Sequence, residues 1–342
     1  MKVLFDIVHP ADVLFFRDAI AKLRADGAAI VIASRHKDIT CQLLDEFGEP
    51  HTPLTAWGGG MVRLAIELIR RDLRLLTLAR RDRPDVMVGF GGVAISHVGR
   101  LLGIPTIGFY DTENARLQIS LTCPFITEWH VPSYWHGPEA KGRTFRFNGF
   151  KELAYLHPRQ FQPRLETAIA LGLSPDRDNF FVRTIAWGAA HDLGKRGWAA
   201  DHLARIVGAL GARGKVHLSA EGAVPAGLEA LLYDGRLRDI HHLLAHCKLF
   251  IGESATMAAE AALLGVPAIC SSAYRMGYIS ELTDGDLVTQ LPGDATAILA
   301  CADERLRNPP GHWLTLRDAA IAGRINVTDY IVERIERLAP GP

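Results

Sequence analysis

The sequence lacks an excess of charge of either sign. Its 38 Lys and Arg residues balance 38 Asp and Glu residues, so the formal net charge at pH 7 is +0. Nothing in this composition indicates the basic surface of a nucleic-acid-binding protein. The apolar runs fall well short of the roughly 20 residues of a membrane span, and Asp6 interrupts the first of them, unlike a signal peptide. We therefore expect no nucleic-acid partner and a cytoplasmic protein.

Cysteine is also scarce. The five cysteines are odd in number, lie far apart and form no C-x-x-C motif. This pattern excludes a disulfide framework and is typical of buried thiols in a reducing compartment. One histidine pair has helical spacing, His242 and His246, but no third ligand lies nearby. Two Asp-x-Asp runs, at 176–178 and 284–286, lie among turn residues. We therefore predict no metal site and no cofactor.

The length of 342 residues is sufficient for two domains of ordinary size. In both halves, short apolar segments alternate with segments that have helical periodicity, which predicts α/β domains with parallel, doubly wound sheets. The stretch 141–149 is polar and punctuated by glycine, so we interpret it as the crossing between the domains. The expected domains are 1–150 and 151–322, followed by a C-terminal helical segment at 323–342.

In such a sheet, ligands bind outside the carboxyl ends of the strands. The polar side chains expected at these ends in the first half are His9, Asp12, Ser34, Arg35, Ser96, Asp111, Glu113 and Asn114. His9 follows the first strand and is our first candidate for a general base, because the pKa of histidine is close to working pH. Alternatively, His9 caps the following helix, and Asp111 or Glu113 is the base.

A glycine motif, GFGGVA at 89–94, matches the pattern G-x-G-x-x-A, and Asp111 follows about 20 residues later. This pattern resembles a dinucleotide-binding fingerprint. However, the fingerprint normally follows the first strand of its fold, and here that strand is followed by His9-Pro10. We therefore interpret Gly91 and Gly92 as a loop that lets a substrate approach the backbone closely.

The segment 61–83 is predicted to be a long amphipathic helix with seven arginines and three acidic residues. A basic amphipathic helix is typical of contact with an anionic membrane surface. An ordinary solvated outer face is the alternative. The sequence thus suggests a peripheral contact with the inner face of the plasma membrane through residues 61–83.

The stretch 249–269 reads as strand, short loop, helix, turn and strand, with the helix at 256–264. A loop of small residues that opens a helix gathers free N–H groups at the positive end of the helix dipole, which favours phosphate. Glu260 lies one turn into this helix, where a carboxylate can accept hydrogen bonds from sugar hydroxyls. The alternative is an ordinary βαβ unit with a capped helix and a solvated Glu260.

Four segments carry a resemblance to a known family: FDIVHPADVLFF at 5–16, GFKELAYLHP at 149–158, WGAAHDLGKRG at 187–197 and GESATMAAEAALLGVPAI at 252–269. They resemble an uncharacterised bacterial and archaeal family of predicted GT-B proteins. These are related in fold to the lipid II N-acetylglucosaminyltransferase and the UDP-GlcNAc 2-epimerase. The resemblance implies two Rossmann-like domains facing a cleft, with the helical segment 323–342 packed back on the first domain.

The resemblance also implies site residues. Backbone and hydroxyl groups of Ser254–Met257 hold the diphosphate, Glu260 binds the ribose and the backbone near Leu243 faces the base. The donor-side residues that the resemblance implies are His191, Glu221, Gly222, Leu243, Ser254, Ala255, Thr256, Met257 and Glu260, and His9 is implied on the acceptor side. The residues themselves add Arg183 to the donor side, as a cation, and Asp12, Arg35, Gly91 and Gly92 to the acceptor side. In place of the usual small glycines this chain has Glu253 and Ala255, whose charge and methyl group oppose a diphosphate unless a cation such as Arg183 offsets them.

The resulting expectation is a metal-independent glycosyltransferase of cell-envelope or exopolysaccharide synthesis. It would move a sugar from a nucleotide-diphosphate sugar to a hydroxyl on a glycan or a lipid-linked carrier, with His9 as the base. The first alternative is a sugar-nucleotide 2-epimerase, which needs further acid and base groups around one sugar. The second is a protein that binds nucleotide sugars without turnover, and the unusual loop at Glu253 favours it.

Overall fold

The computed structural model describes residues 1–339 except 57, 59, 186–197 and 274. The chain divides into two compact units. Unit 1 comprises residues 1–161 and 324–342, and unit 2 comprises residues 162–323. The division falls after residue 161 and not after 150, because the short 3-10 helix η1 (Lys151–Ala154) contacts helices α1 and α13 of unit 1. The C-terminal helix α13 also lies in unit 1.

Unit 1 contains a seven-stranded sheet in which every neighbouring pair is parallel. The strand order is β3-β2-β1-β4-β5-β6-β7. The strands are β1 (Lys2–Ile7), β2 (Ala29–His36), β3 (Thr52–Ala56), β4 (Val86–Phe90), β5 (Thr106–Phe109), β6 (Glu128–Pro132) and β7 (Thr144–Phe147). The helices are α1 (Pro10–Ala25), α2 (Thr40–Glu46), α3 (Met61–Asp82), α4 (Val93–Leu102), α5 (Arg116–Thr122) and α13 (Val327–Leu338). This confirms the predicted doubly wound sheet.

Strand β7 corrects one prediction. The glycine-punctuated stretch 141–149 is not a crossing between domains, because its centre forms this edge strand beside β6. Phe145 and Phe147 alternate with Arg146, and Phe147 is buried whereas Phe145 is partly exposed. A four-residue alternation between turn residues is too short to be distinguished from a loop by its pattern alone.

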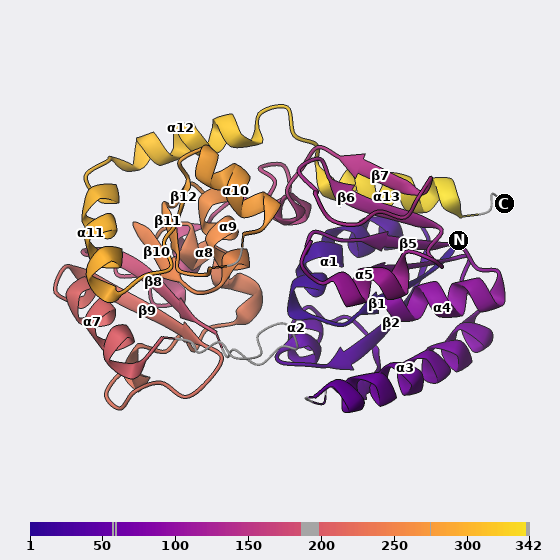
Figure 1. Cartoon of the computed structure of the whole chain (residues 1–342). Helices are drawn as coiled ribbons and strands as arrows, with labels where there is room; N and C mark the ends of the chain where they lie inside the picture. Colours follow the sequence, from indigo (N-terminus) through magenta and orange to yellow (C-terminus); the bar gives the residue numbers. More distant parts are fainter. Residues whose placement is uncertain (57, 59, 186–197, 274, 340–342) are drawn as a thin grey trace. The chain divides into compact units, whose positions relative to one another are not determined.

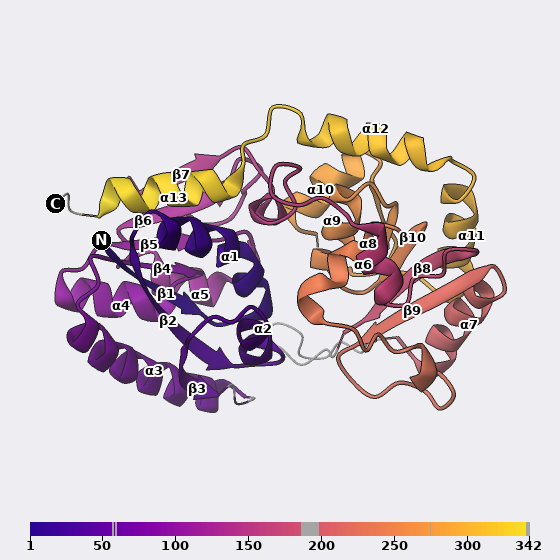
Figure 2. The ribbon, with the colours of Figure 1, turned by 180° about the vertical axis from the view of Figure 1, so that it is seen from behind.

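Alternation along the strands gives the sheet of unit 1 a core on both faces. Phe5 packs against Phe16 of α1, with ring centroids 5.3 Å apart. The neighbouring Leu4 lies in the cluster that contains Leu75 of α3 and Trp129 of β6. Figure 1 shows α3, α4 and α5 together, and Figure 2 shows α1 and α13 on the other side of the sheet.

Helix α13 is fixed to unit 1 by polar as well as apolar contacts. Arg334 donates to both carboxylate oxygens of Glu128, at 2.6 and 3.2 Å, and its guanidinium lies 4.5 Å from the centroid of the Phe145 ring. Tyr330 Oη lies 2.7 Å from His130 Nδ1. These contacts join residues about 200 positions apart in the chain, so α13 completes the fold of unit 1.

Unit 2 contains a five-stranded parallel sheet in the order β12-β11-β10-β8-β9. The strands are β8 (Asp178–Thr184), β9 (Gly214–Ala220), β10 (Leu249–Gly252), β11 (Ala268–Cys270) and β12 (Val288–Gln290). The α-helices are α6 (Leu165–Ala170), α7 (Ala200–Gly211), α8 (Ile240–Leu244), α9 (Ala255–Leu263), α10 (Gly277–Asp284), α11 (Ala295–Arg305) and α12 (Pro310–Ile321). Among the residues that the structure describes, no helix is long and apolar enough to cross a membrane.

Candidate functional site

The strand orders point to one edge in each unit. In unit 1 the order reverses between β1 and β4, and in unit 2 it reverses between β8 and β10. Ligands of doubly wound sheets bind at the carboxyl ends of the strands beside such a switch point. The candidate residues of unit 1 follow β1, β4 and β5, and those of unit 2 follow β8, β9 and β10.

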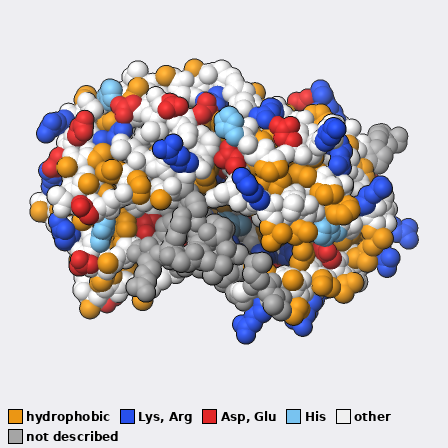
Figure 3. Space-filling view, viewed as in Figure 1, with side chains coloured by type: hydrophobic (Ala, Val, Ile, Leu, Met, Phe, Trp, Pro, Cys, Tyr) orange, Lys and Arg blue, Asp and Glu red, His pale blue; other side chains and the backbone are white. Residues whose placement is uncertain are grey.

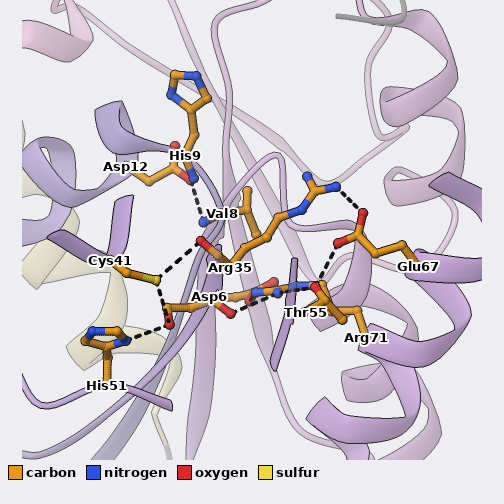
Figure 4. A network of polar contacts seen from close by, with 11 residues as sticks. Asp6, Val8, His9, Asp12, Arg35, Cys41, His51, Thr55, Glu67 and Arg71 are labelled. Carbon is orange, nitrogen blue, oxygen red and sulfur yellow. Dashed lines mark hydrogen bonds and ion pairs between the residues drawn. The ribbon is translucent and has the colours of Figure 1, made fainter. Parts of the chain in front are cut away.

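At the switch point of unit 1, His9 is the N-cap residue of α1. Its Nδ1 accepts a hydrogen bond from the backbone N–H of Ala11 at 3.2 Å. The buried carboxylate of Asp12 accepts from the backbone N–H groups of Val8 and His9, at 3.0 and 2.9 Å. The two side chains thus form a reciprocal capping box. Asp12 stabilises the start of α1, and the ring of His9 points away from its carboxylate (Figure 4).

The surroundings of His9 disfavour the charged form of its imidazole. Desolvation by the surrounding protein lowers the pKa of His9 well below its usual range, and the positive charges of Lys37, Lys151 and Arg35 act in the same direction. The ring is exposed, so water screens part of this effect. Burial raises the pKa of Asp12 to about 7, although the two backbone N–H groups oppose this shift.

Behind this edge lies a buried cluster of Asp111, Lys151 and Glu152. The Nζ of Lys151 lies 2.8 Å from Asp111 Oδ2 and 2.5 Å from Glu152 Oε1. All three residues are at most 5% exposed. Burial raises the pKa of Glu152, the charge of Asp111 raises it further, and Lys151 opposes both. The second carboxyl oxygen of Glu152, Oε2, is buried without a hydrogen-bond partner.

The sequence did not single out Lys151 and Glu152. The feature of the sequence that identifies them is a pair of adjacent charged residues inside the otherwise apolar stretch 150–156. Two adjacent charges within such a run are either exposed on one side or buried together with a partner. The partner, Asp111, lies on a different strand end, so only the fold identifies it.

The other predicted residues of this edge have different surroundings. Glu113 is partly exposed, and its Oε1 accepts from the backbone N–H of His136 at 3.4 Å. Gly91 and Gly92 both have positive φ angles, 75° and 59°. A Cβ at Gly91 would lie 2.1 Å from the side chain of Gln118. These two positions therefore require glycine for the turn itself, and whether a substrate approaches them stays a prediction.

Arg35 belongs to a polar network across β1, β2, β3 and α3 (Figure 4). Its guanidinium pairs with Glu67, which also accepts from Thr55 Oγ1 at 2.7 Å. Next to it, the buried Arg71 pairs with the buried Asp6. The pairing with Glu67 occupies Arg35, so this network chiefly fixes α3 on the sheet.

At the switch point of unit 2, α9 begins immediately after β10. Its N-cap is Ser254, whose Oγ accepts from the backbone N–H of Met257 at 3.3 Å. Ser254, Thr256 and Met257 are partly exposed, whereas Ala255 is buried. The helix covers 255–263, one residue earlier at each end than the sequence predicts. The arrangement places N–H groups and the positive helix end at the carboxyl edge of the sheet.

Glu253 does not point its charge toward the start of α9. It is buried, its Oε1 accepts from the backbone N–H of Trp198 at 3.0 Å, and its Oε2 accepts from that of Ile185 at 3.2 Å. These two residues flank the segment 186–197, which lies outside the described residues together with the predicted site residue His191. Glu253 therefore has a structural use, since it joins the residue after β8 to the residues before α7.

Glu260 is placed differently from the sequence expectation. It is 4% exposed, and its Oε1 lies 3.2 Å from Nε2 of the buried His241 on α8. The side chain of Leu243 is wholly buried. Glu260 is therefore not the solvated carboxylate of the alternative interpretation, and whether the backbone near Leu243 faces a base stays a prediction. If Glu260 binds a ribose, its carboxylate must either contact His241 and the ribose at the same time or give up its contact with His241.

The remaining donor-side residues lie at the ends of β8 and β9. The guanidinium of Arg183 pairs with Ser219 and with the exposed Glu221, beside Gly222, which has open space around its Cα. Arg183 is thus already paired with a carboxylate, and whether it also offsets the charge of a phosphate stays a prediction. Within the described part of the chain, no group of three or more His, Cys, Asp or Glu side chains could hold a metal ion.

These two parallel-sheet units define the class of protein: the chain has the GT-B fold, with two Rossmann-like units. The UDP-GlcNAc 2-epimerase from Neisseria meningitidis, determined bound to UDP-GlcNAc, matches with a TM-score of 0.66 at 12% identity, over 98% of this chain and 100% of that chain. The glycosyltransferase SsfS6 from Streptomyces sp. SF2575 matches with a TM-score of 0.61 at 15% identity, over 98% and 99%. MurG from Acinetobacter baumannii matches with a TM-score of 0.59 at 14% identity, over 98% and 100%.

At these identities the likeness establishes the fold alone. Residues 1–167 match the family model described as "Protein of unknown function (DUF354)". The family match covers just under half of the chain, and the GT-B fold that the sequence resemblance implies is confirmed. No curated protein matches the sequence.

Proposed function

We propose that the protein transfers a sugar from a nucleotide-diphosphate sugar to a hydroxyl group. The observation that carries this proposal is the start of α9, where a capped helix meets the carboxyl end of β10 beside the switch point of unit 2. Such a helix start binds phosphate through backbone N–H groups and the helix dipole. The fold supports the proposal, because proteins of this fold include glycosyltransferases and an epimerase bound to UDP-GlcNAc.

In this proposal unit 2 binds the donor and unit 1 binds the acceptor. The acceptor hydroxyl oxygen forms a bond to the anomeric carbon, and the bond from that carbon to the diphosphate oxygen breaks. The electron pair leaves with the diphosphate, whose added charge the start of α9 stabilises. The hydroxyl proton passes to a base at the carboxyl edge of unit 1, and the candidates are His9, Asp111 and Glu113. No metal ion takes part.

Two alternatives rest on particular observations. An epimerase is favoured by the solved epimerases of the same fold and by the acidic groups Asp111, Glu113 and Glu152 in unit 1. A protein that binds without turnover is favoured by the buried pairing of Glu260, which leaves no exposed carboxylate one turn into α9. Turnover of a bound nucleotide sugar without any acceptor indicates the epimerase, and binding without turnover indicates the third candidate.

The experiment is a thermal shift against a panel of nucleoside diphosphates and nucleotide sugars. The test variant is Thr256→Asp at the second position of α9, where a carboxylate favours the helix but repels a phosphate. Thr296→Asp is the matched control, because Thr296 has the same position in α11 of the same unit. A ligand at 100 times its Kd stabilises by about 2.7 kcal/mol. We expect stabilisation by one nucleotide family in wild type and control, and its loss in Thr256→Asp. No response to any nucleotide would refute the proposal.

We also propose that the outer face of α3, α4 and α5 (the α3–α5 face) contacts an anionic membrane surface that carries the acceptor. Large apolar side chains are exposed there, among them Ile69 at 61%, Leu73 at 59% and Leu101 at 67%. Exposed arginines surround them on the same helices: Arg63, Arg70, Arg80, Arg100 and Arg116. Figure 3 shows hydrophobic side chains gathered over these helices with Lys and Arg around them. Apolar and basic groups together match an anionic lipid surface.

Vesicle co-sedimentation tests this contact. Wild type is expected to sediment with vesicles that contain anionic phosphatidylglycerol and to remain in solution with neutral phosphatidylcholine or at high salt. The variant Ile69→Ser with Leu73→Ser should lose most of this binding. A matched control is Leu165→Ser with Ile169→Ser, two exposed apolar residues on α6 of unit 2. Equal binding of all variants, or none to anionic vesicles, would contradict the contact.

A further inference from the structure

The two ring nitrogens of His9 have different surroundings. Nδ1 accepts a hydrogen bond from the N–H of Ala11, and a nitrogen that accepts carries no proton. A neutral imidazole has a single ring proton, which must then lie on Nε2. The ring is exposed, so Nε2–H can reach a ligand at the carboxyl edge of unit 1. In this tautomer His9 offers a hydrogen bond and has no free lone pair on Nε2.

A histidine that acts as a base needs the opposite arrangement. Its Nδ1–H is normally held by a carboxylate or carbonyl, which leaves the lone pair of Nε2 free. The neighbouring carboxylates do not supply this contact. Asp12 accepts from two backbone N–H groups, and Asp111 pairs with Lys151. The lowered pKa of His9 also opposes proton uptake.

We propose that His9 is a hydrogen-bond donor, through Nε2–H, to an oxygen atom of the acceptor substrate, and is not the group that removes the proton. This inference rests on the proposed function. It implies that the acceptor carries a hydroxyl, carbonyl or phosphoryl oxygen next to the reacting hydroxyl. The proton of that hydroxyl passes to a carboxylate as its oxygen bonds to the sugar carbon and the diphosphate leaves. Of the two predicted carboxylates, Glu113 is accessible, whereas Asp111 is buried and paired.

The tautomer can be measured without any substrate. In protein with ¹⁵N-labelled histidine, NMR distinguishes Nδ1–H from Nε2–H, and the His9→Asn variant identifies the signal of His9. We expect the Nε2–H tautomer, with no titration of His9 between pH 5 and pH 8. An Nδ1–H tautomer, or titration of His9 near pH 6.5, would overturn the inference. This result does not depend on nucleotide binding, so it separates the inference from the proposed function.

Three substitutions test the role in turnover. Asn, Asp and Ser are all favourable N-caps, so His9→Asn, His9→Asp and His9→Ser should each keep the start of α1. Only Asn retains an N–H donor. With the nucleotide sugar that binds, measured as release of its nucleoside diphosphate, we expect His9→Asn to stay within about 10-fold of wild type and to keep its pH profile. Asp and Ser should lose about 100-fold or more. Equal losses in all three variants would overturn the donor role.

Discussion

Replacement of Lys151 by methionine is the most informative perturbation of unit 1. Lys151 lies between two buried carboxyl groups, 2.8 Å from Asp111 and 2.5 Å from Glu152. Neither carboxyl group is exposed by more than 2%. Methionine has a similar length and no charge, so Lys151→Met removes the ammonium and leaves the volume largely unchanged.

The expected loss depends on pH. Removal of one partner from a buried ion pair costs about 3–5 kcal/mol of the free energy of unfolding. Burial already raises the pKa of Glu152 above 4.5, and the loss of Lys151 raises it further. A carboxyl whose pKa is raised in the folded state contributes stability at low pH that is lost as pH rises toward that pKa. Each such group changes stability by about 1.4 kcal/mol per pH unit in that window. The loss should therefore be largest above pH 7 and smallest near pH 5.

Urea denaturation, followed by circular dichroism at pH 5, 6, 7 and 8, measures this difference. The control is Lys141→Met, an exposed lysine of the same unit, for which we expect a change within about 0.5 kcal/mol at every pH. The double variant with Asp111→Asn should regain part of the stability, since it removes one of the unpaired charges. A loss that is the same at all pH values, or below about 1 kcal/mol at pH 8, would refute the reasoning.

Three further predictions concern stability. Arg334→Leu should lower the free energy of unfolding by about 2 kcal/mol in urea denaturation, because it removes the guanidinium from the buried Glu128 and leaves it only the contact with His130 Nε2 at 2.9 Å; an unchanged midpoint would contradict this. The hydrogen bond to Asp72 raises the pKa of His97, so the stability difference between wild type and His97→Asn should be greatest below pH 6.5 and should shrink as pH rises; a difference that grows with pH would oppose it. Glu253→Gln leaves one of two partly buried backbone N–H groups without an acceptor, and calorimetry should show about 1–3 kcal/mol of destabilisation; wild-type stability would show that the end of β8 and the start of α7 do not depend on the carboxylate.

Patterns within a few residues were sufficient for much of the fold. The alternation of strands and helices predicted two doubly wound sheets, and the segments at 5–16 and 252–269 indicated the GT-B fold. The helix at 255–263 was predicted to within one residue at each end. The edge strand β7 was missed, because its four residues lie among turn residues and have too little pattern to identify them.

The candidate site was predicted only in outline. The sequence predicted that His9 and Asp111 follow strands, and in the structure they follow β1 and β5. They lie at the same edge of the sheet, since the carboxyl ends of parallel strands share one edge. The sequence left open whether His9 is a base or a helix cap, and the contact with Ala11 N–H makes it the cap. Glu260 was expected at the surface, but it is buried against His241 of another helix.

The sequence by itself determined which segments become strands and helices, because hydrophobic periodicity and capping act over a few neighbouring residues. Only the tertiary structure decided the partners of the buried charges. The oxygens of Glu253 meet N–H groups 55 and 68 positions away, and Arg334 meets Glu128 across 206 positions. A buried charge must find a partner wherever packing brings one, and packing joins segments that no local pattern relates.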